Sequence, residues 1–217
     1  MSKYSLLIVG AMEEELFPTI DFLNNDPNIK LVNSSTTPVY QLNNLFITVL
    51  KTGVGLINAT QALTRHIVTM HSMGHSYDCI LNVGAVAAIN KDINLFEVCY
   101  PTKVAESGNP MTSPISFDTH GILINRKGGN YPRFIRHLTG NYIYNNVSQL
   151  EEKYRDYDTF DMELYALAKV CWLYGEPFYS IKVVSDTGED FEEEFMERVK
   201  EVGNVIAEEI KRIVYSL

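Results

Sequence analysis

The sequence predicts an α/β protein, because segments with the pattern of buried strands alternate with segments that have the period of amphipathic helices. Near the N-terminus a strand at 4–10 precedes a helix at 13–24, and the chain closes with a strand at 178–185 and a helix at 191–215. The 217 residues, 46% of them apolar, suffice for a full hydrophobic core. We therefore expect one domain spanning residues 1–217, without linker or internal repeat.

Short apolar runs bounded by turn-forming residues predict the remaining strands. They lie at residues 38–42, 45–51, 78–83, 96–104 and 121–125. A helix is expected to open at about Leu56, after the turn Gly53-Val54-Gly55, because apolar residues then recur at helical spacing. Helices are also expected at 146–154 and 161–174, the second ending at Gly175. The turn-rich segment 106–118 reads as a long loop, and 138–144 as a segment of mixed type.

Composition excludes several classes of partner and cofactor. The net charge of −9 disfavours binding to nucleic acid or to an anionic membrane surface. Three distant cysteines, without a C-x-x-C pair, favour buried reduced thiols in a cytoplasmic protein and give neither a zinc site nor a disulfide framework. The chain leads directly into its first strand, which argues against a signal peptide, and no apolar run approaches the ~20 residues of a membrane span.

Three segments end in carboxylates at places where an α/β sheet binds its ligands. The first strand runs into Glu13-Glu14-Glu15, the segment Asp161-Met162-Glu163 opens a predicted helix, and the last strand runs into Ser185-Asp186. Because ligands of open α/β sheets lie at the carboxyl ends of the strands, these groups suggest acid/base chemistry.

Each of these features also has a purely structural interpretation. Glu13 and Glu14 suit the positive end of a helix dipole, and Asp161 suits a helix N-cap. The turn Gly53-Val54-Gly55 allows a ligand to approach the backbone, but a tight turn explains it equally well and no dinucleotide fingerprint follows. The five histidines form no metal-binding pattern.

Taken together, the segments resemble the nucleoside phosphorylase superfamily, and within it the family of 5'-methylthioadenosine/S-adenosylhomocysteine nucleosidases. The matching segments are Ile8–Glu15, Thr52–Ala59, Leu81–Gly84, Asp161–Glu163 and Val184–Asp186, which occur in the family's order. The resemblance implies a three-layer α/β domain whose central mixed, partly barrel-like sheet is flanked by helices. It also implies hydrolysis of a purine nucleoside without a cofactor or metal, and a homodimer.

The resemblance assigns roles to residues of the matching segments. Glu15 would be the base that activates water, and Asp186 would protonate the purine. Glu163 would bind the ribose hydroxyls. The other positions expected to contact the substrate are Met12, Val54, Gly84, Ile143, Tyr144, Met162 and Ser185.

Hydrolysis is favoured over phosphorolysis on electrostatic grounds. Phosphorolytic relatives carry an arginine near the position of the glutamates, whereas Glu13-Glu14-Glu15 would repel phosphate. A phosphate-dependent phosphorylase and a non-catalytic nucleoside-binding module remain alternatives. The family's Gly-Ser-Ala-Gly-Gly is here Gly84-Ala85-Val86-Ala87-Ala88, and Asn141 replaces an aspartate, which leaves the base and the 5' group of the substrate open.

Overall fold

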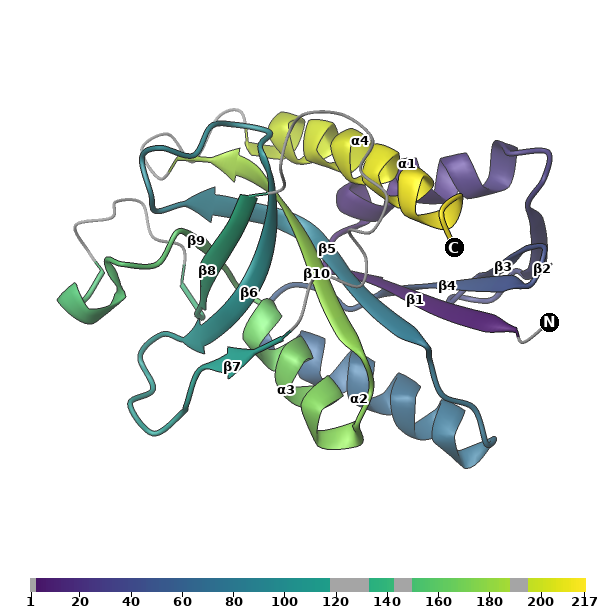
Figure 1. Ribbon diagram of the computed structural model, residues 1–217, viewed down its shortest axis with the longest axis horizontal. Coiled ribbons are helices and arrows are strands. Elements are labelled where there is room, and N and C mark those ends of the chain that lie inside the picture. The colour runs from purple at the N-terminus through teal and green to yellow at the C-terminus, as the bar shows by residue number, and fades with distance from the viewer. Residues whose placement is uncertain (1–2, 118–132, 143–149, 188–194) are drawn as a thin grey trace.

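The computed structural model describes residues 3–117, 133–142, 150–187 and 195–217. Strands and helices alternate in the N-terminal and C-terminal parts of the chain, which confirms the predicted α/β class (Figure 1). The strands are β1 (Tyr4–Gly10), β2 (Lys30–Asn33), β3 (Val39–Leu42), β4 (Leu45–Lys51), β5 (Cys79–Ala88), β6 (Val98–Glu106), β7 (Ile115–Ser116), β8 (Arg133–Thr139), β9 (Thr159–Asp161) and β10 (Phe178–Asp186). The helices are α1 (Glu13–Asn25), α2 (Leu56–Ser72), α3 (Leu164–Tyr174) and α4 (Phe195–Val214).

The strands form one mixed sheet that closes on itself at one end. Strands β4, β1, β5 and β10 are parallel neighbours, as expected for strands connected by helices. Strand β10 also pairs with β6, and β6 continues through β8 and β9 back to β5. Five strands therefore form a barrel-like ring, and β1, β4, β3 and β2 extend from it.

The helices cover the two faces of the sheet in pairs, as Figure 1 shows, with α1 and α4 on one face and α2 and α3 on the other. Each pair encloses its own apolar cluster against the central strands. The first pair packs closely because α4 has a glycine at the contact. A Cβ on Gly203 would lie 2.3 Å from the carbonyl oxygen of Glu14, so a larger residue there would force the helices apart.

Most long elements lie where the sequence predicts them, and several short strands were missed. Strands β2, β8 and β9 were not predicted, and β7 lies within the segment expected to be a loop. Strand β5 continues to Ala88, beyond the turn expected after Gly84, because its second half pairs with β10 and β9.

Two predictions about the central part of the chain were wrong in detail. Helix α3 begins at Leu164, because the preceding residues of β9 pair with β5 and β8. Residues Glu152–Tyr154 form a 3₁₀ turn and not the end of an α-helix. The strand expected at 121–125 lies outside the described residues. Among the helices of the described ranges, none is long and apolar enough to cross a membrane.

Candidate active site

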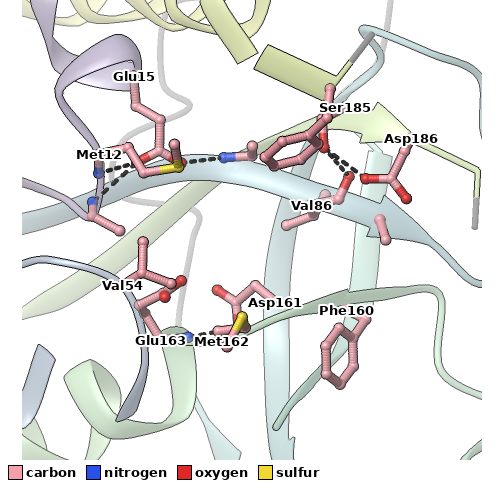
Figure 2. A pocket seen from close by; sticks show the side chains of 14 residues that line it. Met12, Glu15, Val54, Val86, Phe160, Asp161, Met162, Glu163, Ser185 and Asp186 are labelled. Atoms are coloured by element: carbon pink, nitrogen blue, oxygen red, sulfur yellow. Dashed lines mark hydrogen bonds between the residues drawn. The ribbon is translucent and has the colours of Figure 1, made fainter. Parts of the chain in front are cut away.

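A cavity of about 240 Å³ lies at the carboxyl ends of the parallel strands β1, β5 and β10. Seven residues predicted from the sequence line it, and they come from five different elements and turns. They are Met12, Glu15, Val54, Met162, Glu163, Ser185 and Asp186. Figure 2 shows Met12 and Glu15 on one side of the cavity and Ser185 and Asp186 on the other. The fold thus brings together side chains that lie up to about 170 residues apart in the sequence.

The carboxylate of Glu15 is held by three backbone N–H groups. Its Oε2 accepts hydrogen bonds from Ala11 (3.0 Å) and Met12 (2.8 Å), and its Oε1 accepts one from Ala85 (2.8 Å). The bond from Met12 is half of a capping box, because Met12 is the N-cap of α1 and Glu15 is its third residue. Glu15 therefore both caps its helix and presents a fixed carboxylate to the cavity.

Burial raises the pKa of Glu15 above its usual value. The three N–H donors and the ammonium of Lys182 act in the opposite direction without cancelling this effect. Both charged groups lie beside Gly84. A Cβ at Gly84 would lie 3.0 Å from Glu15 Oε1 and 3.3 Å from Lys182 Nζ. Gly84 does not line the cavity, and its part is to leave space for these groups.

Glu163 reaches from the start of α3 to the start of α2. Its Oε1 accepts a hydrogen bond of 2.6 Å from the N–H of Gly55, the N-cap of α2. Gly53 and Gly55 have φ angles of 82° and 94°, so the turn needs glycine at both positions. The helix N-terminus that the sequence suggested as a ligand site thus binds a carboxylate of the protein itself.

Burial and the nearby charge of Asp161 raise the pKa of Glu163 to about 7. The folded protein therefore holds a proton on Glu163 at pH values at which an unfolded chain has already lost it. This raised pKa contributes stability that is fully present below the ordinary glutamate pKa of about 4.5 and is lost as the pH rises through about 7.

We expect the wild-type protein to lose about 3 kcal/mol of unfolding free energy relative to Glu163→Gln between pH 4.5 and pH 8. Urea denaturation of both proteins at half-unit pH intervals measures this difference. The glutamine variant is the matched control, because it keeps the shape of the side chain but has no proton to lose. A constant difference across this pH range would contradict the raised pKa.

Asp161 lines the cavity and lies at the centre of a buried polar cluster. Its Oδ2 is 2.8 Å from Nζ of Lys182, and its Oδ1 accepts a 2.7 Å hydrogen bond from the hydroxyl of Thr139. Asp161 was expected to be the N-cap of α3. It belongs to β9, but its carboxylate accepts a hydrogen bond from the N–H of Leu164, the first residue of that helix. Burial opposes its ionisation, but Lys182 and His137 hold its pKa well below the usual range.

A β-bulge places two consecutive side chains of β10 at the cavity. The pairing register with β5 shifts between Val184 and Asp186, so that Asp186 pairs with Ala87. As a result Ser185 and Asp186 both line the cavity, where regular alternation would send one of them away. The Ser185 hydroxyl lies 2.9 Å from Oδ2 of Asp186 and holds that carboxylate.

Several cavity residues were not predicted as site residues. They are Ala11, Ala85, Val86, Ala87, Phe160, Asp161 and Phe195. Most are apolar and carry no sequence signal apart from their proximity to a motif. Lys182 was also missed, although a lysine within an otherwise buried strand is a signal in itself. The predicted residues Ile143 and Tyr144 lie outside the described residues.

The described part of the cavity wall has no lysine, arginine or histidine among its lining residues. Likewise, no group of three His, Cys, Asp or Glu side chains within the described ranges is arranged to hold a metal ion. Four carboxylates line the cavity: Asp161 is paired with Lys182, and Glu15, Glu163 and Asp186 lie separately on an otherwise largely apolar wall. Such a cavity can donate and accept protons at three sides of a bound molecule.

Comparison with known proteins gives a consistent picture. A family model described as the phosphorylase superfamily matches residues 5–217. A curated relative, the 5'-methylthioadenosine/S-adenosylhomocysteine nucleosidase of Bacillus pumilus, is 25% identical over an alignment of 204 positions, which covers 83% of this chain and 85% of that protein.

Two solved structures from Helicobacter pylori share the fold. A futalosine hydrolase mutant superposes with a TM-score of 0.82 at 16% identity, over 99% of this chain and all of that chain. A 5'-methylthioadenosine/S-adenosylhomocysteine nucleosidase in complex with a small molecule gives a TM-score of 0.82 at 17% identity, with both chains fully covered.

Proposed function

Because the chain belongs to the phosphorylase superfamily, we propose that it hydrolyses the N-glycosidic bond of 5'-methylthioadenosine, S-adenosylhomocysteine or both, with release of adenine and a thioribose product. The observation that carries this proposal is the placement of Glu15, Glu163 and Asp186 around one cavity. The curated relative named above has this activity in its name, which supports the choice of substrate.

Asp186 is the proton donor to the leaving purine. Breaking an N-glycosidic bond develops positive charge on the sugar and negative charge on the base, so protonating the base makes it a leaving group. Asp186 is 3% exposed and is held by Ser185, so its carboxyl group is positioned before a ligand binds. The apolar side chains of Val86 and Phe160 line the cavity with it and suit the faces of a purine ring. Ile143 and Tyr144 belong to the same base-binding role.

Glu163 binds the ribose. A carboxylate accepts hydrogen bonds through two oxygens, and its negative charge stabilises the oxocarbenium-like transition state. Met12, Met162 and Val54 supply apolar contacts to the sugar and its 5' group. The N–H of Gly55 binds Oε1 of Glu163, and no hydrogen bond from the described residues occupies the second oxygen, which can therefore bind a hydroxyl.

Glu15 orients and deprotonates the attacking water. Its raised pKa brings it closer to the neutral operating range of a general base, and its hydrogen bonds hold it in one orientation. Attack by phosphate is disfavoured, because a second anion would enter a cavity in which carboxylates already surround the sugar. The N-terminus of α2, a common phosphate site, binds Glu163 instead.

A substrate panel tests the proposal. The protein is incubated without phosphate with 5'-methylthioadenosine, S-adenosylhomocysteine, adenosine, inosine and futalosine, and free base is measured by liquid chromatography. Adenine release from the first two is the expected result. Turnover only after phosphate is added would identify a phosphorylase. Thermal stabilisation by these compounds without turnover would identify a binding module and overturn the proposal.

The proposal includes a single domain that acts as a homodimer in the cytoplasm, in methionine salvage. Val54 lines the cavity, yet it is 44% exposed, and Ile57 in the first turn of α2 is 80% exposed. Apolar side chains exposed at the rim of a binding site mark a surface that another protein covers. A second subunit at this surface would close the cavity near the 5' group.

We expect Ile57→Glu to convert a dimer into a monomer and to raise KM for 5'-methylthioadenosine more than it lowers kcat, because charge at the rim opposes burial there. Analytical ultracentrifugation measures the first effect and steady-state kinetics the second. Val68→Glu, on the same helix but farther from the cavity, serves as the matched control. A wild-type protein that sediments as a monomer at micromolar concentration would refute the dimer.

A further inference from the structure

A histidine that no motif identifies lies in the polar cluster under the cavity. His137, on β8, is fully buried, and its Nε2 is 2.9 Å from Oδ1 of Asp161. Its Nδ1 is 2.7 Å from the hydroxyl oxygen of Thr159, which is also fully buried. The Nε2–H does not point directly along the line to Asp161, so this contact is mainly electrostatic. Burying a histidine side chain costs folding free energy unless its two nitrogens interact with other polar groups.

The charge states within the cluster follow from its contacts. Burial lowers the pKa of His137, so the imidazole is neutral at pH 7. A neutral imidazole has one donor and one acceptor nitrogen. The Thr159 hydroxyl can donate to Nδ1, which leaves the imidazole proton on Nε2, the nitrogen 2.9 Å from Oδ1 of Asp161. Asp161 then carries the negative charge that the buried ammonium of Lys182 requires.

Lys182 links this cluster to Glu15. The lysine is 1% exposed, its Nζ is 2.8 Å from Asp161 Oδ2, and it approaches Glu15 over Gly84. Its attraction favours the ionised form of Glu15. The position in which Asp161 holds the ammonium of Lys182 sets its distance from Glu15. That distance therefore determines how strongly Lys182 stabilises the ionised form of the proposed base.

We propose that His137 and Thr159 are positioning residues for the hydrolytic reaction, which hold Asp161 in the orientation that keeps Lys182 beside Glu15. The inference rests on the proposed function, because it gives Glu15 the role of base. Two contacts fix Oδ1 of Asp161 from the β8 side, from His137 and Thr139, so that Oδ2 faces Lys182. Without the imidazole, Oδ1 keeps the hydrogen bonds from Thr139 and from the N–H groups of Glu163 and Leu164, but it loses its second contact on the β8 side, so the carboxylate can turn and draw the ammonium away from Glu15.

His137→Leu is expected to raise the pH midpoint of Glu15, because Lys182 then favours its ionised form less. The other groups that act on Glu15 and Glu163 are unchanged in the variant: the N–H donors of Ala11, Met12, Ala85 and Gly55, and the charges of Glu15 and Glu163 on one another. We expect a shift of about one pH unit upward in the acidic limb of kcat/KM, a fall in kcat of about tenfold, and a KM changed less than about twofold.

The experiment compares wild type, His137→Leu and His137→Gln. The glutamine amide can place an N–H near the position of Nε2, so His137→Gln is expected to restore most of the pH profile. His66→Leu is the matched control, because His66 is a partly buried histidine that is bound to the Tyr77 hydroxyl and is not among the cavity residues. Thermal unfolding of all four proteins reports any general loss of stability.

A second readout does not depend on turnover. Carbon-13 NMR of glutamate-labelled protein follows the titration of the Glu15 carboxyl in the absence of substrate. An upward shift of its midpoint in His137→Leu, with recovery in His137→Gln, supports the inference even if the substrate panel shows no hydrolysis. An unchanged midpoint overturns it, whether or not kcat falls, because a loss of activity would then reflect only damaged packing.

Discussion

Replacing Asp186 with asparagine is expected to lower kcat for 5'-methylthioadenosine by ~10²–10⁴-fold, the range typical of a positioned proton transfer. Asparagine keeps nearly the same shape and can still accept the hydrogen bond from Ser185. It has no acidic proton to give to the purine, so the base must leave as an anion. KM should change little, because the apolar contacts to the ring remain.

A substrate whose leaving group needs no proton tests specifically whether Asp186 is the proton donor. The 4-nitrophenolate of a 4-nitrophenyl riboside leaves without protonation, so Asp186→Asn should cleave this substrate at a rate close to that of the wild type. The matched control is Asp156→Asn, at an exposed position in the turn before β9. Wild-type turnover of 5'-methylthioadenosine by Asp186→Asn would refute the assignment of the proton donor. Equal losses with both substrates would point to a misfolded cavity.

Replacing Glu15 with glutamine is expected to lower kcat by a similar ~10²–10⁴-fold, because the amide cannot take a proton from water. The change also has a structural cost. In one orientation the glutamine amide places an NH₂ group against the N–H donors of Ala11 and Met12, so the cap of α1 weakens by about 1 kcal/mol.

The two variants should differ in their response to the leaving group. Glu15→Gln acts on the attack of water, so the 4-nitrophenyl riboside should not restore its activity. Glu14→Gln is the matched control, since Glu14 lies in the same helical turn but does not line the cavity. Chemical denaturation separates the stability loss from the kinetic loss. Activity within about threefold of wild type would exclude Glu15 as the general base.

The sequence predicted the parts of the site that lie within local motifs. Glu15 and Asp186 were found because each follows a buried strand, and strand ends of an α/β sheet meet at one edge. The contact between Glu163 and Gly55 could not be predicted, since it joins residues 108 positions apart in sequence. The glycine turn showed only that something approaches the backbone there, and that group is a carboxylate of the same chain.

The closure of the sheet into a ring and the buried charged residues could not be predicted from local sequence patterns either. Strand β9 has three residues and β8 contains two arginines and a histidine, so neither has the continuous apolar pattern of a central strand. Lys182 and His137 are buried only because Asp161 lies between them, and that position depends on the closed sheet. Their role follows from the tertiary structure and not from spacing along the chain.

Strand β5 sets the spacing between the proposed general base and the proposed proton donor. Glu15 binds the N–H of Ala85, and Asp186 pairs with Ala87, so two residues of one extended strand, about 6.6 Å, set their offset along the sheet. Because their backbone partners are offset in this way, the two carboxyl groups are not held together as a pair that shares one proton, which needs a separation of about 3 Å. Acid and base therefore keep independent charge states, and the backbone itself maintains the gap in which a sugar fits.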